Sequence, residues 1–148
     1  MVALSRPDYL RHLHPLHAIL LAFPLPLFAG ALASDFAYWS TFQIQWANFS
    51  SWLIAGGLLV GGFALLWALI NLFRRGPARK GRLVVYFVVL LAMWGLGLIN
   101  ALVHAKDAWA TMPEGLYLSA ITTLLALVAA WIGYSGFHTR EFRTGEVR

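Results

Sequence analysis

The sequence contains no cysteine and little charge. None of its 148 residues is a cysteine, and only 11% are Asp, Glu, Lys or Arg. Soluble domains carry about 25% charged residues. The absence of cysteine excludes a disulfide framework, a thiolate metal site and a cysteine nucleophile. The scarcity of charge, with 60% hydrophobic residues and a mean hydropathy of +0.70, indicates an integral membrane protein.

Familiar catalytic motifs are missing as well. The chain has no glycine-rich phosphate loop, no H-E-x-x-H zinc motif and no G-x-S-x-G nucleophile motif. Its net charge of +5 comes from basic residues in short segments between apolar runs, which is a membrane-topology pattern. We therefore expect the lipid bilayer as the surroundings, no nucleic-acid partner and, on balance, no enzymatic activity.

Four apolar runs follow one another along the chain. Each is close to the ~20 residues that an α-helix needs to cross the hydrocarbon layer. Because backbone polar groups in lipid must be satisfied within the segment, runs of this length predict helices. The sequence thus predicts an all-α fold, an integral membrane four-helix bundle forming a single domain over residues 1–148. The expected spans are 15–38, 50–73, 83–103 and 116–137.

Basic residues are concentrated on one side of this bundle. With four spans, both termini and the middle loop share a side, which holds every Lys and Arg except Lys106. The positive-inside rule then predicts cytoplasmic termini in a multi-pass protein of the bacterial inner membrane. A cleavable signal peptide ending near residues 31–33 is the alternative for the first span. Pro24, Pro26 and the histidines at its entrance disfavour cleavage.

Small residues mark a packing face on the second span. Gly57 and Gly61 form a small-xxx-small pattern, which permits the close backbone approach that holds helices together in lipid. We favour packing within the chain over a homo-oligomer face. In the first span, Pro24 and Pro26 should kink the helix and free some of its carbonyl groups.

One group of polar residues is expected where the first and third spans end. Ionisable residues at membrane depth are costly and indicate function by default. Asn100 and His104 are four residues apart, so they share a helix face. A histidine beside a carboxylate could relay protons or hold a metal, whereas the structural alternative is a network that locks the helix ends. We call this group the aspartate–histidine corner: Asp35, Tyr38, Asn100, His104 and Asp107.

A second group lies at the opposite end. His14 and His17 are three residues apart and share a face, a spacing that suits joint metal ligation or an axial ligand to haem. Haem b in such a bundle needs facing histidines, and His17 with His138 is the best-matched pair. Otherwise the histidines cap the helix or meet lipid phosphate. Asn71 and Tyr86, expected at the same depth, offer a metal few charged ligands.

Four stretches carry a resemblance to a known family. They are HPLHAILLAFPLPLFAGALASDFAYW, QWANFSSWLIAGGLLVGG, LINALVHAKDAW and GLYLSAIT. With them the chain resembles, from His14 to about Trp131, the bacterial inner-membrane protein family catalogued as domain of unknown function 2231. The resemblance implies four helices and a membrane location rather than a reaction. The resemblance implies an Asp at position 71 and a His at position 86 in many family members, where this chain has Asn71 and Tyr86. The aspartate–histidine corner, in contrast, matches the family pattern.

These observations support three functional hypotheses. The leading one is a non-enzymatic small or accessory subunit of a membrane complex, motivated by the small size and the glycine-faced helices. The second is a haem b electron-transfer protein that uses His17 or His14 with His138. The third is proton or ion handling at the aspartate–histidine corner.

Overall fold

The chain folds into helices separated by short connections. A computed structural model describes residues 14–74, 80–106 and 110–135, and within these ranges it contains no strand. The prediction of an all-α protein is therefore confirmed, as is that of four helical segments long and apolar enough to cross a membrane. His12, Asp107 and His138 lie outside the described residues. The helices are α1 (Pro15–Ala22), α2 (Pro24–Thr41), α3 (Ile44–Arg74), α4 (Lys80–His104) and α5 (Glu114–Ser135).

The first span consists of two helices, α1 and α2, which meet at Phe23. Proline has no N–H, so Pro24 and Pro26 leave the carbonyls of Leu20 and Ala22 without their usual partners four residues on. The break between the helices falls where these two backbone hydrogen bonds are missing. The regular helical pattern resumes at Leu27, whose N–H donates to the Phe23 carbonyl at 3.2 Å. The two prolines thus divide the first span at the place where the sequence predicts a kink.

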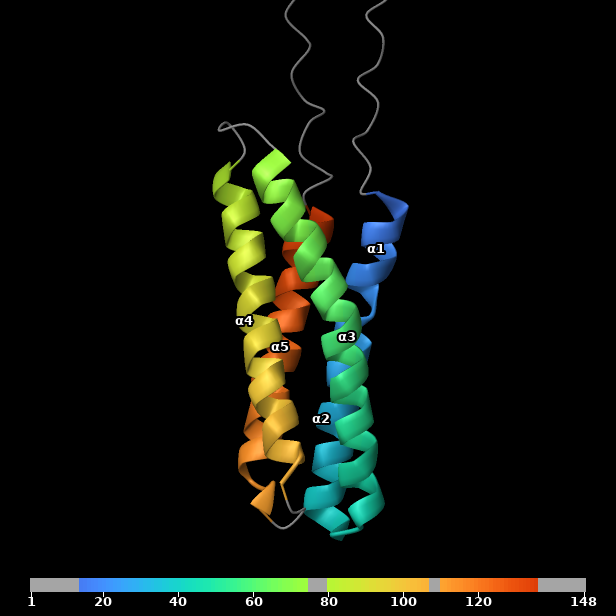
Figure 1. Cartoon of the computed structure of the whole chain (residues 1–148). Coiled ribbons are helices and arrows are strands. Elements are labelled where there is room, and N and C mark those ends of the chain that lie inside the picture. Colours follow the sequence, from blue (N-terminus) through green and yellow to red (C-terminus); the bar gives the residue numbers. More distant parts are fainter. Residues whose placement is uncertain (1–13, 75–79, 107–109, 136–148) are drawn as a thin grey trace, which may run out of the picture.

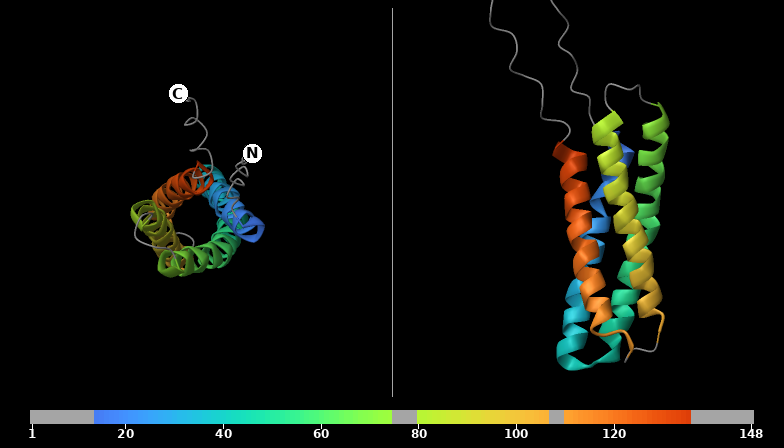
Figure 2. Two further views of the ribbon diagram at one scale, coloured as in Figure 1. Left: turned by 90° about the horizontal axis from the view of Figure 1, so that it is seen from above. Right: turned by 90° about the vertical axis from the view of Figure 1, so that its left-hand side faces the viewer.

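The four spans form a closed ring. Helices α2, α3, α4 and α5 pack in that order, α5 returns to α2, and α1 packs mainly on α3 (Figures 1 and 2). Only Phe42 and Gln43 separate α2 from α3, and such short connections join antiparallel neighbours. The "Asp35 end" is the end where α2 meets α3 and α4 approaches α5. The "His17 end" is the opposite one, where α1 begins.

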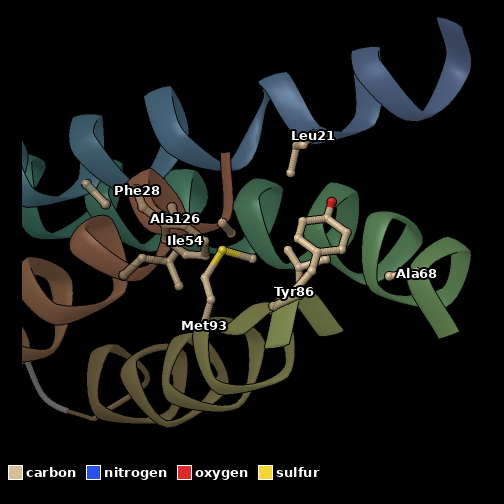
Figure 3. Packing of buried hydrophobic residues seen from close by; sticks show 10 residues of the cluster. Leu21, Phe28, Ile54, Ala68, Tyr86, Met93 and Ala126 are labelled. Atoms are coloured by element: carbon tan, nitrogen blue, oxygen red, sulfur yellow. The ribbon is translucent and has the colours of Figure 1, made fainter. Parts of the chain in front are cut away.

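Apolar side chains fill the middle of the ring. Phe28, Ile54, Leu90 and Met93, one or more from each of α2, α3 and α4, are fully buried, and Figure 3 shows three of them gathered beside Ala126 of α5. Large apolar residues on the outer faces are exposed instead, as expected for helices surrounded by lipid.

Phe28 of α2 packs directly on the backbones of α3 and α4. A Cβ added to Gly57 of α3 would lie 3.0 Å from its ring, and one added to Gly97 of α4 would lie 3.2 Å away. The methyl of Met93 would lie 3.3 Å from a Cβ on Gly61. Gly57 and Gly61 therefore face the interior of this chain, where the missing side chains leave room for Phe28 and Met93.

Candidate functional site

A carboxylate and an imidazole meet inside the Asp35 end. Asp35 lies on α2 and His104 is the last residue of α4, so the pair spans the ring between helices that are not neighbours. The Nε2 atom of His104 is 2.9 Å from Oδ1 of Asp35. Asp35 is 0% exposed, and the His104 side chain is 1% exposed. This is a buried pair of ionisable groups, which membrane proteins rarely contain without a functional reason.

The surroundings determine where one of the histidine hydrogens lies. Nδ1 of His104 is 3.0 Å from the backbone carbonyl oxygen of Asn100. A carbonyl only accepts, so Nδ1 carries a hydrogen and donates it. Nε2 and Oδ1 of Asp35 are 2.9 Å apart, a hydrogen bond that requires one further proton on one of these two atoms. Whether that proton sits on His104 or on Asp35, the pair has no net charge.

A second hydrogen bond to the carboxylate comes from Ser119, which in turn bonds Asn100. Ser119 of α5 donates its hydroxyl to Oδ2 of Asp35 at 2.5 Å and accepts from Nδ2 of Asn100 at 2.8 Å. All three residues are fully buried. Within the described residues, Oδ1 of Asn100 has no hydrogen-bond partner. Since a buried unpaired acceptor is unfavourable, this atom marks a place where a further group would be stabilised.

The fourth helix joins through Ser50 of α3. Its Oγ is 3.3 Å from the Ala31 carbonyl oxygen and also 3.3 Å from Nε2 of His104. The hydroxyl donates to the Ala31 carbonyl, and its oxygen lies equally close to the histidine nitrogen that faces Asp35. We call the complete set the buried polar network, and it takes residues from all four spans: Asp35, Ser50, Asn100, His104 and Ser119.

The first turn of α5 packs on the imidazole. A Cβ on Gly115 would lie 2.8 Å from Cε1 of His104 and 2.9 Å from Cγ2 of Thr111. Helix α5 begins at Glu114, directly after Pro113, and its acidic first residue suits the positive end of the helix dipole. Only a residue without a side chain fits at position 115, so the start of α5 holds the His104 ring against Asp35.

The structure brings together three members of the predicted aspartate–histidine corner. Asp35, Asn100 and His104 take part in the network, whereas Asp107 lies outside the described residues. Tyr38 is buried one turn beyond Asp35, and its ring contacts that of Phe42 at 6.4 Å between centroids. Among the described residues, its hydroxyl makes no hydrogen bond to the network.

The predicted group at the His17 end is only partly assembled. His17 is buried, and its Nε2 lies 3.1 Å from the hydroxyl of Tyr86 on α4. The rings of His14 and His17 both lie beside Trp67 of α3, at centroid distances of 5.1 and 5.7 Å. Asn71 is half-buried on α3. Among the described residues, no three His, Asp or Glu side chains gather as metal ligands do.

The haem hypothesis stays a prediction, because His138 lies outside the described residues. A haem iron on His17 would need a free ring nitrogen. Nε2 faces Tyr86, and Nδ1 is buried without a partner in the described chain. His14 is exposed.

The sequence reasoning missed Ser50, Gly115 and Ser119. A serine in a membrane helix usually bonds its own backbone, so the residue type alone does not indicate a site. One signal was available: Ser50 lies in the stretch QWANFSSWLIAGGLLVGG, and the other two lie in GLYLSAIT, both of which carry the family resemblance.

Comparison with known families agrees with the fold. The model of a family described as predicted membrane protein (DUF2231) matches residues 13–139. No curated protein and no solved structure gives a match. The match covers most of the chain, so the protein belongs to this family, and the predicted resemblance is confirmed. Four helices of membrane-spanning length fit the family's description.

Proposed function

We propose that this member of the family is a non-enzymatic, multi-pass membrane protein that binds and releases a proton at the Asp35–His104 pair. One observation carries the proposal: a fully buried carboxylate and a fully buried imidazole lie within hydrogen-bonding distance, 2.9 Å apart. An unpaired charge at this depth would cost several kcal/mol, so each group depends on the other. Histidine is also the side chain whose charge changes most readily near neutral pH.

The position of exposed aromatic residues supports proton exchange with the nearer membrane face. Trp39 follows Asp35 by one turn, Trp52 follows Ser50 by two residues, and Tyr117 precedes Ser119 by two. All three aromatic side chains are exposed on the outside of the bundle. Tryptophan and tyrosine concentrate at the membrane–water interface. The buried polar network would then lie just beneath one surface of the bilayer.

The core disfavours a proton path across the whole membrane. Thr122, one turn further into the bundle from Ser119, donates its hydroxyl to carbonyls of its own helix. Beyond it lie Phe28, Ile54 and Met93, which are fully buried and apolar (Figure 3). These side chains offer no hydrogen-bonding groups for a proton to follow. We therefore propose proton binding from one side rather than proton transport.

The charge distribution supports an orientation for this site. Arg74 and Arg82, two of the basic residues that the sequence predicts on the cytoplasmic side, lie at the His17 end. By the positive-inside rule, the Asp35 end would face the outside of the bacterial inner membrane. Proton binding would then respond to the external pH.

Proteoliposomes with separate pH dyes inside and outside would test the proposal. After an external acid pulse, we expect proton uptake by the wild type without acidification of the lumen. Asp35→Asn should abolish the uptake. Thr123→Ala is a matched control, because among the described residues the Thr123 hydroxyl bonds only the Ser119 carbonyl of its own helix. Lumenal acidification that depends on Asp35 would contradict one-sided binding, and equal uptake by Asp35→Asn would contradict the site.

The orientation can be tested separately because the chain has no cysteine. Gln43 and Gly81 are exposed near opposite ends, and a Cβ at Gly81 would meet no atom within 4 Å. With a membrane-impermeant maleimide on intact cells, Gln43→Cys should be labelled and Gly81→Cys should not. The reverse pattern would place the Asp35 end in the cytoplasm.

The accessory-subunit hypothesis stays a prediction. The apolar residues exposed on the outer faces of the helices would be covered equally well by lipid or by other subunits. Their distribution therefore favours neither a complex nor a monomer.

A further inference from the structure

We propose that the buried polar network also binds a small monovalent cation, with sodium as the fitting example, in place of the proton shared by Asp35 and His104. The inference rests on the proposed proton site and adds a competing ligand to it. Sodium binding would release the proton, and protonation would expel sodium. The site would thus hold one positive charge at a time.

Charge balance is the first step of the argument. Asp35 is fully buried, and the proton that it shares with His104 keeps the pair neutral. When that proton leaves, an uncompensated carboxylate remains inside the bundle. A buried charge without a partner is strongly unfavourable. A cation that enters as the proton leaves restores neutrality, so the exchange of one sodium ion for one proton leaves the charge of the site unchanged.

The available ligand atoms are the second step. Sodium, like other hard cations, prefers oxygen ligands such as carboxylate, amide carbonyl and hydroxyl groups. Oδ1 of Asp35 loses its hydrogen-bond donor when Nε2 of His104 gives up the proton. Oδ1 of Asn100 is already buried without a partner, and the nitrogen of the same amide is held by Ser119, itself bonded to Asp35. One anionic and one neutral oxygen are therefore free in the same network.

Ser50 supplies the third step. After deprotonation, Nε2 of His104 becomes an acceptor that needs a donor. The Ser50 hydroxyl is 3.3 Å from that nitrogen and 3.3 Å from the Ala31 carbonyl oxygen. By turning from the carbonyl to the imidazole, it satisfies the neutral histidine. Nδ1 keeps its hydrogen bond to the Asn100 carbonyl throughout. The imidazole can thus stay in place while Asp35 changes its partner.

No other described charge faces the pair closely enough to replace the cation. Helix α2 contributes Asp35 and the neutral Tyr38, and α3 contributes only Ser50. Beyond His104, the next charged residue is Lys106, which is exposed, and α5 contributes Glu114, exposed in its first turn. Asp35 and His104 are the two groups whose protonation sodium would change.

Proton release on adding salt tests the inference. The probe is sodium chloride, added to purified full-length protein in weak buffer with a pH dye, with choline chloride as the control at equal ionic strength. We expect sodium, but not choline, to release close to one proton per chain. Because the two cations compete for one site, the apparent sodium affinity should weaken about tenfold for each pH unit of acidification while the proton-bound form predominates.

Two neighbouring serines provide a matched pair of variants. Ser50→Ala removes the hydroxyl that neutral His104 needs, so the apparent sodium affinity should fall about tenfold, the effect of one lost hydrogen bond. Ser51→Ala should leave it unchanged, because within the described part of the chain the Ser51 hydroxyl bonds only the Ala47 carbonyl of its own helix. Both variants keep every charged residue, and both substitute alanine, which suits a helix.

The outcomes separate this inference from the proposed function. Equal release by sodium and choline would overturn the cation site and leave an internal water as the partner of Asn100. Sodium-dependent release that survives Asp35→Asn would overturn it too. An apparent sodium affinity of Ser50→Ala equal to that of Ser51→Ala would overturn the hydroxyl switch. In each case, proton uptake by the wild type without sodium would still support the proton site.

Discussion

Gly115 offers a sharp test of how the start of α5 positions His104. In Gly115→Ala, the new Cβ would lie 2.8 Å from Cε1 of His104 and 2.9 Å from Cγ2 of Thr111. Neither neighbour is the flexible end of a long side chain, so the ring must move away from Asp35 or α5 must shift. Overpacking of this kind costs about 1–3 kcal/mol.

Helix propensity works in the opposite direction. Replacing glycine with alanine inside a helix stabilises it by up to ~1 kcal/mol. Gly115 is the second residue of α5, where the gain is smaller than in a helix interior. We therefore expect a net loss of roughly 1–2 kcal/mol in the free energy of unfolding. Displacement of the ring should also weaken proton uptake at the Asp35–His104 pair.

Gly95→Ala is the matched control. Gly95 lies inside α4, and a Cβ there would meet no atom within 4 Å, so this variant should be as stable as the wild type or slightly more stable. Thermal unfolding in mild detergent and the proton-uptake assay compare the two variants. If Gly115→Ala matches Gly95→Ala in both assays, the contact between α5 and the imidazole has no role in holding His104.

Three further substitutions probe the network, the His17 end and the core. Ser119→Ala should lose about 1–3 kcal/mol of unfolding free energy, because it leaves Asp35 Oδ2 and the Asn100 amide unpaired. A loss no larger than that of Thr123→Ala in the same denaturation assay would refute this. Tyr86→Phe should lose ~1 kcal/mol, because Nε2 of His17 loses its partner, and unchanged thermal stability would count against that bond. Phe28→Ala should lose about 3–5 kcal/mol by opening a cavity between two helix backbones, and a loss below ~1 kcal/mol would contradict the packing described.

Much of the fold could be predicted because lipid restricts the alternatives. Apolar runs of spanning length must be helical, and Pro24 and Pro26 must interrupt the first of them. The position of the break at Phe23 depends on where the missing hydrogen bonds begin, which the proline positions already indicate. What the sequence could not show is how deeply the side chain of Phe28 lies between Gly57 and Gly97, which come from separate helices.

The candidate site was only partly predictable for a similar reason. Asn100 and His104 share a face of one helix, so their spacing predicts that they lie together. A serine is ambiguous, because its hydroxyl bonds its own helix as readily as a neighbour. The Ser51 hydroxyl bonds the Ala47 carbonyl of its own helix, whereas the Ser50 hydroxyl bonds the Ala31 carbonyl of α2. The difference comes from the rotation of α3 about its axis, which only the packed bundle determines.

The proton shared by Asp35 and His104 is most directly tested by side-chain nitrogen NMR of His104. Protein labelled with ¹⁵N-histidine in lipid nanodiscs would be titrated with pH, and the His104 signals would be assigned by their loss in His104→Asn. The structure predicts that Nδ1 keeps its hydrogen throughout, because it faces the Asn100 carbonyl, while Nε2 titrates. Asp35→Asn should shift the Nε2 titration and leave Nδ1 protonated. Loss of the Nδ1 hydrogen, or a titration of Nε2 indifferent to Asp35, would contradict the account.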